Sequence, residues 1–408
     1  MPETTTATVE MASPTDDNLA RRNVVFLACA QSLAGAGAPI CISLGGIVGH
    51  YLLGPDKSLA TLPVTAFVVG TAFATLPAGY LAKRFGRRHG LMNGSLVGVV
   101  GGIIAAYAIF LGQFWLFCLG VLFAGSTGAF VQQYRFAAAD TASEVFRPKA
   151  ISWVMAGGVL AGVIGPQTAA LTKDLFAPIL FAGAFIGLSA LAALSWLALG
   201  FLRFPPVQKQ EAQTGGRPLL EIMSQGRFIV AVLCAVSSYA VMSFVMTAAP
   251  LAMIACGHST AEAVLGIQWH VLAMFGPSFF TGSLIQRFGK ERIVGLGLVL
   301  LASCAALALT GLELATFWGA LVLLGVGWNF GFIGATAMLT DTYRPEEKNR
   351  VQAVNDFIVF GFVAAASLSS GGILNAFGWE TINIMVFPVV AVTLLLLFFT
   401  RQKKSQAA

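Results

Sequence analysis

The chain has 408 residues, of which 57 % are hydrophobic and only 10 % are charged. Together with a mean hydropathy of +0.80, this composition excludes a soluble globular protein and predicts repeated crossing of a membrane. A net charge of +6 is by itself compatible with binding to nucleic acid. The basic residues are distributed as membrane-topology signals, however, so we exclude a nucleic-acid role.

Apolar segments long enough to cross a bilayer recur along the whole chain. We predict twelve membrane-spanning helices in two bundles of six, at residues 21–203 and 227–401, and hence an all-α membrane protein. In chain order the predicted spans are 24–52, 59–82, 90–111, 114–136, 150–171, 176–202, 228–253, 263–285, 293–312, 316–339, 351–374 and 382–399.

Three polar stretches flank these bundles. Residues 1–20 are polar and acidic and predict a disordered tail, residues 204–226 predict a linker, and residues 402–408 predict a second tail. With twelve spans, every Lys and Arg except Lys57 and Lys173 falls on the side of the two chain ends. This positive-inside distribution predicts a multi-pass protein with both termini and the linker in the cytoplasm.

The loop after the second span is repeated after the eighth. G-Y-L-A-K-R-F-G-R-R begins at Gly79, and G-S-L-I-Q-R-F-G-K-E-R begins at Gly282, half a chain later. The first copy resembles the motif G-x-L-a-D-r-x-G-r-[RK] of the major facilitator superfamily, and this resemblance implies the fold of that family, two pseudo-symmetric six-helix bundles. The matching residues are Gly79, Leu81, Arg84, Gly86, Arg87 and Arg88.

One position of the motif departs from the family. Lys83 replaces an acidic residue that, in the family, helps to lock the outward-open state, and Gln286 takes that place in the second copy. Asp140 and Asp341 are the substitute partners that we consider for the basic loops. The residues that we expect to act as conformational gates are Gly79, Arg84, Gly86, Arg87, Gly282, Arg287 and Gly289.

Two pairs of residues four positions apart suggest a metal site. Met242 and Met246 share a face of the seventh span, His270 and Met274 share a face of the eighth, and the two pairs lie equally far from the turn between these spans. Three thioethers and an imidazole at matched depth form a ligand set that selects a soft ion, copper(I) first.

Each of these residues also has a simpler explanation. Methionine commonly fills gaps between apolar helices. His270 could instead carry a proton, or be a structural residue bonded to Gln268 or to a backbone carbonyl. Cys256 and His258, in the turn above the pairs, and Cys234, two turns below Met242, are weaker candidates for capture and release of the ion.

The two pairs resemble the M-x-x-x-M and H-x-x-x-M motifs of the CcoA-like copper importers of bacteria, a group within the same superfamily. This resemblance implies copper as the transported ion, import by alternating access across the bacterial inner membrane, and supply of copper for haem-copper oxidase assembly. We expect no cofactor, a monomer, and periplasmic or cytoplasmic copper chaperones as partners.

Two other kinds of transporter remain open. A sister group, which lacks both motifs, is associated with riboflavin uptake; a protein of that kind could use Trp269, Phe279, Phe280 and Trp328 as a stacking surface. An efflux pump for lipophilic cations should have a buried carboxylate in the first half, where no convincing one occurs. We expect no enzyme, because neither a nucleophile–base set nor a phosphate-binding loop is present.

Overall fold

The computed structural model describes residues 17–143, 146–204, 216–344 and 347–406. In lipid every backbone N–H and C=O must be paired internally, so these apolar segments fold as helices. Residues 1–16 of the predicted tail, residues 205–215 of the linker and the last two residues therefore lie outside the described residues. Among the described residues, a helix begins at Asp17 and another runs to Gln406. Helix therefore extends into both of the predicted tails.

The described part of the first half contains seven helices, because two of its spans are broken and two others join in one long helix across a kink at Gly86. The break in the first span falls at Gly35–Ala36, and the break in the fourth falls at Gln132–Gln133. In chain order the helices are α1 (Asp17–Ala34), α2 (Gly37–Leu52), α3 (Leu62–Leu111), α4 (Phe114–Val131), α5 (Tyr134–Thr141), α6 (Arg147–Thr172) and α7 (Ala182–Gly200).

The second half follows a short linker helix. Its eighth span is bent by 42° at Gly276–Pro277, and a break at Gly378 interrupts α14. The helices are α8 (Leu219–Met223), α9 (Gly226–Ala255), α10 (Thr260–Phe275), α11 (Ser278–Phe288), α12 (Lys290–Ala308), α13 (Leu314–Leu339), α14 (Lys348–Ile384) and α15 (Val386–Gln406).

Nine of the helices in the described part of the chain are long and apolar enough to cross a membrane, or ten if α10 and α11 form one bent span. Two of the twelve predicted spans remain. One corresponds to the short apolar helix Leu62–Thr75, and the other to the second of the two spans within Arg350–Phe399. Each of the twelve predicted spans thus corresponds to a helix, and the predicted fold class is confirmed.

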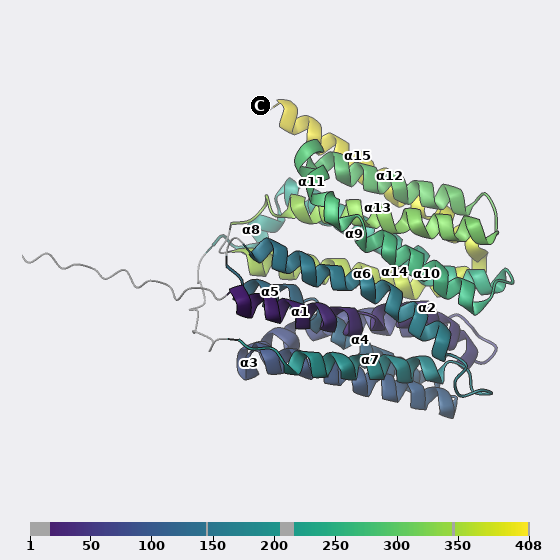
Figure 1. Cartoon of the computed structure of the whole chain (residues 1–408). Helices are drawn as coiled ribbons and strands as arrows, with labels where there is room; N and C mark the ends of the chain where they lie inside the picture. The colour runs from purple at the N-terminus through teal and green to yellow at the C-terminus, as the bar shows by residue number, and fades with distance from the viewer. Residues whose placement is uncertain (1–16, 144–145, 205–215, 345–346, 407–408) are drawn as a thin grey trace, which may run out of the picture.

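The two halves lie side by side as bundles (Figure 1). The first half, from purple to teal, lies below the second half, from green to yellow, and the described chain ends lie at the same end of the molecule. We call this the terminal end and the other the distal end. Gly86 and Gly289, at equivalent places of the repeated loops, both adopt a left-handed φ, of 79° and 89°. Because glycine alone adopts such a φ without strain, the two loops turn in the same way.

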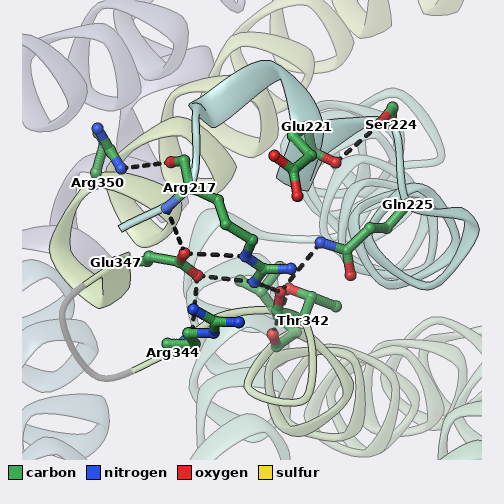
Figure 2. A network of polar contacts seen from close by, with 9 residues as sticks. Arg217, Glu221, Ser224, Gln225, Thr342, Arg344, Glu347 and Arg350 are labelled. Atoms are coloured by element: carbon green, nitrogen blue, oxygen red, sulfur yellow. Dashed lines mark hydrogen bonds and ion pairs between the residues drawn. The ribbon is translucent and has the colours of Figure 1, made fainter. Parts of the chain in front are cut away.

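The described end of the linker is fixed to the second half at the terminal end (Figure 2). Glu347 is fully buried and accepts hydrogen bonds from Arg217 Nε at 3.0 Å, Arg217 Nη2 at 2.8 Å and the Arg344 backbone N–H at 2.9 Å. Arg217 also donates to the Thr342 carbonyl at 3.1 Å. The Arg217 hydrogen bonds hold the pKa of Glu347 well below its usual range.

Candidate functional site

The four residues of the predicted metal set lie inside the second half. The side chains of Met242, Met246 and Met274 are at most 7 % exposed and belong to the hydrophobic core of that half. His270 is fully buried. A capping box, in which Ser259 and Glu262 bond one another's backbone N–H groups, begins α10 and sets the place of His270 along that helix.

The imidazole of His270 bonds to the neighbouring helix. Its Nδ1 lies 2.8 Å from the carbonyl oxygen of Leu321 on α13, and because a carbonyl only accepts, Nδ1 carries the proton. The helices approach closely here, since a Cβ placed on Gly325 would lie 2.5 Å from the His270 carbonyl oxygen. Nε2 has no partner among the described residues. The structure thus shows the hydrogen bond to a backbone carbonyl that the sequence suggested, and metal ligation by His270 stays a prediction.

Of the three weaker candidates, Cys234 lies apart from Cys256 and His258, which share the turn after α9. Cys234 is buried in the core of the second half, whereas Cys256 is exposed at the end of α9, where partial burial raises its thiol pKa. His258 donates from Nε2 to the Leu312 carbonyl at 2.8 Å and packs against the Phe317 ring. Its ring is therefore held against the start of α13, and no cluster of three His, Cys, Asp or Glu side chains that could hold a metal occurs among the described residues.

The predicted gate loops form equivalent ion pairs in the two halves. Arg87 lies 2.5 Å from Asp140, and Lys290 lies 2.6 Å from Asp341. The structure confirms the expectation that Asp140 and Asp341 form ion pairs with the basic loops. The other arginines match as well, since Arg84 lies over the ring of the following Phe85 and Arg287 over that of Phe288. A gating role for these residues stays a prediction.

An aromatic cluster joins three helices of the second half. The ring of Tyr239 on α9 lies 5.3 Å from Trp328 and 5.0 Å from Phe332, both on α13, and 5.7 Å from Phe360 on α14. Trp328 and Phe332 are stacked at an interplanar angle of 16°. The indole Nε1 of Trp328 is buried and has no hydrogen-bond partner among the described side chains. We call these four residues the aromatic cluster.

Of the four aromatic residues suggested by the sequence, only Trp328 belongs to this cluster. Trp269, Phe279 and Phe280 are 46 %, 63 % and 50 % exposed on α10 and α11. Tyr239, Phe332 and Phe360 were missed. Two spacings could have indicated them, because Tyr239 precedes Met242 by one helical turn and Phe332 follows Trp328 by one turn.

A pair of opposite charges from different halves was also missed. Arg135 on α5 and Asp356 on α14 interact through their charges across the interface between the halves. Each is an ionisable residue inside a predicted span, and such residues commonly mark a transport pathway. Asp356 also interacts electrostatically with Tyr239, so the charged pair lies beside the aromatic cluster.

The two halves are held together toward the distal end. Thr65 donates to Ser367 at 3.2 Å and Gln167 to Gln268 at 2.8 Å. The backbone is also tightly packed there, since a Cβ on Gly371 would lie 2.3 Å from the side chain of Thr61. These contacts join the two halves toward the distal end of the interface.

Comparison with known proteins identifies the family of this chain and a relative whose substrate is named. The model of the Major Facilitator Superfamily matches residues 24–278 and 231–408. The riboflavin transporter RfnT of Brucella anthropi is 52 % identical over 396 residues, covering 97 % of this chain and 99 % of the relative. The uncharacterized transporter YddS of Bacillus subtilis is 29 % identical over 409 residues, covering 95 % of this chain and 94 % of the relative.

Solved structures support the same fold. A bacterial homologue of the human lysosomal transporter Spinster, in an inward-facing and unoccupied conformation, superposes with a TM-score of 0.70 at 15 % identity, covering 95 % of this chain and 97 % of the other. A variant of the nucleoside transporter NupG gives a TM-score of 0.70 at 14 % identity, covering 91 % of this chain and 99 % of the other. At these identities the similarity concerns the fold alone.

The expectation of copper import is wrong. A riboflavin transporter matches this chain along nearly its whole length at 52 % identity, which favours the organic-solute alternative over copper import. This similarity does not test Met242, Met246, His270 and Met274 as metal ligands, and that role stays a prediction. The copper chaperones and oxidase assembly implied by that resemblance lose their support with it.

Proposed function

The chain belongs to the major facilitator superfamily and is a multi-pass protein of the bacterial membrane, and we propose that it imports riboflavin by alternating access. The similarity to RfnT over 97 % of the chain supports the substrate. In this fold the two bundles rock about a site near the middle of the membrane, between them. The proposal requires a surface there that suits a flat, conjugated three-ring compound with a polar chain.

The aromatic cluster is the observation that carries this proposal. Tyr239, Trp328 and Phe332 lie near the middle of α9 and α13, and the neighbouring ring centroids are 5.0–5.3 Å apart. Aromatic rings bind one another at such distances in stacked and edge-to-face arrangements. An isoalloxazine ring, which is flat and apolar on its faces, is a ligand that this cluster fits.

The orientation follows from the basic residues. The terminal end carries Arg87, Arg217, Lys290 and Arg350, in line with the positive-inside rule, so we place this end and both termini in the cytoplasm of the inner membrane. The distal end, where the halves are joined, then faces the periplasm.

Growth of a riboflavin-auxotrophic bacterium without an importer tests the function. We expect the parent chain to support growth at riboflavin concentrations at which an empty vector does not, and the Trp328→Leu variant to require more riboflavin than the parent. Trp269→Leu, at an exposed tryptophan of α10, is the matched control and should behave as the parent. If the parent chain is present in the membrane and growth equals that of the vector, riboflavin import is wrong.

A further inference from the structure

The charged pair between the halves lacks the direct contact that other ion pairs of this protein make. Direct pairs occur among the described residues at Arg87–Asp140, Arg217–Glu347, Lys290–Asp341 and Lys173–Asp174. Arg135 and Asp356 attract each other without such a contact. The Nε of Arg135 is buried and has no hydrogen-bond partner among the described residues. An unbonded guanidinium donor inside a membrane protein is costly, so it is expected to bind a partner in another state.

The position of Asp356 connects this pair to the aromatic cluster. Asp356 and Phe360 are four residues apart on α14 and share a face of that helix. The charge of Asp356 also acts on Tyr239, whose ring contacts Phe360. Asp356 is exposed, and its Oδ1 accepts a hydrogen bond from the Asn355 side chain at 3.1 Å.

We propose that Arg135 and Asp356 together bind the imide edge of a flavin whose ring lies against the aromatic cluster. This inference rests on the proposed riboflavin function. The imide edge presents a carbonyl oxygen, an N–H and a second carbonyl oxygen in a row. A carboxylate accepts from the N–H, and a guanidinium donates to a neighbouring carbonyl oxygen, so the pair matches that edge in both polarity and order.

This arrangement also explains why the two charges come from different halves. Asp356 belongs to α14 and Arg135 to α5, so a ligand held by both connects the two bundles. Some of the binding energy is realised only when both halves contact the ligand. This part of the binding energy favours the state in which the two halves enclose the ligand. The pair is thus expected to select the substrate and to assist closure around it.

Binding of flavins to the purified protein in lipid nanodiscs tests the inference. Quenching of flavin fluorescence gives the dissociation constant for riboflavin and for N3-methylriboflavin, in which the imide N–H is blocked. For the parent chain we expect the methylated flavin to bind about tenfold more weakly, the effect of one lost hydrogen bond to a charged group. Asp356→Ala should remove this discrimination, and Asp356→Asn, which keeps the shape of the side chain, should weaken it.

Arg135→Gln should weaken binding of both flavins, because the carbonyl oxygens remain in both. Glu380→Ala and Arg292→Gln, at exposed charges elsewhere in the second half, are the matched controls and should bind as the parent does. Suppose that the parent binds riboflavin and that the Arg135 and Asp356 variants bind each flavin as tightly as the parent does. The assignment of this pair is then wrong, while riboflavin transport stands. If the parent binds neither flavin, the proposed function itself fails.

Discussion

The Nδ1 of His270 lies 2.8 Å from the carbonyl oxygen of Leu321, and this hydrogen bond joins α10 to α13 within the second half. It satisfies a polar group that membrane burial would otherwise leave unpaired. It also fixes the ring in one orientation, with Nδ1 protonated. His270 therefore links α10 to α13, the helix that carries Trp328.

Replacement of His270 tests this structural role. In His270→Ala the Leu321 carbonyl loses its donor, which costs about 1–3 kcal/mol of folding stability. We expect a lower melting temperature in detergent and, per molecule of folded protein, riboflavin uptake within about twofold of the parent. His89→Ala, at an exposed histidine of the first repeated loop, is the control with little effect on melting. Complete loss of uptake by a well-folded His270→Ala protein would place His270 in the transport mechanism.

The aromatic cluster gives a second prediction. Trp328→Leu keeps the site apolar but removes the ring that stacks on Phe332. Aromatic pairs contribute about 0.5–1.5 kcal/mol beyond burial, so we expect riboflavin to bind roughly tenfold more weakly. Isothermal titration of the purified protein measures this change. Trp269→Leu should leave the affinity unchanged, and equal affinities of Trp328→Leu and the parent would exclude the cluster from the binding site.

The matched ion pairs of the two halves give a third prediction. Exposed ion pairs contribute about 0.2–1 kcal/mol, so Asp140→Asn or Asp341→Asn alone should slow riboflavin uptake by less than about fivefold. The two pairs occupy equivalent places, and we expect the double variant to be slower than either single variant. The exchange Lys290→Asp with Asp341→Lys should restore the rate, because it restores the pair. Failure of the exchange to improve on Asp341→Asn would separate the pair from transport.

Glu347 gives a prediction about pH. Arg217 lowers the folded-state pKa of Glu347 below its ordinary value of 4.5, so the folded state favours the ionised form. The stability that this group contributes is fully present above about pH 4.5 and is lost as the pH falls toward the lowered pKa. Glu347→Gln should therefore lower the melting temperature at pH 7, and the difference from the parent should shrink below pH 4.5.

Differential scanning fluorimetry from pH 7 to pH 3 makes this measurement. Glu221→Gln, at the exposed acid of α8, is the matched control, and its melting curve should follow that of the parent at every pH. A difference between Glu347→Gln and the parent that stays constant down to pH 3 would contradict the role of the Glu347 charge.

Much of the fold was predictable because the membrane restricts the choice of structure. Long apolar segments must be helices, and the repeat at Gly79 and Gly282 showed two related halves. The helix breaks were harder to predict, since Gly and Pro are common in membrane helices and only some of them bend the chain. Gly378 interrupts α14, whereas Pro250 lies within the continuous helix α9. Which of them bends depends on packing against neighbouring helices.

The site was less predictable, because a spacing of four residues gives a shared face and not its direction. The spacing of His270 and Met274 was correct, but the face that carries His270 is directed to Leu321 of the same half. Arg135 and Asp356 are more than half of the chain apart in sequence, so their relation depends on how the halves pack. The ionisable character of both residues inside predicted spans was the available signal.

Uptake of radiolabelled riboflavin into proteoliposomes that contain only this protein tests the central claim most directly. We expect saturable uptake that unlabelled riboflavin competes away, that copper(I) chelators do not change, and that Trp328→Leu reduces while Trp269→Leu does not. Uptake equal to that of protein-free liposomes, from protein shown to be folded and inserted, would contradict riboflavin transport by this chain.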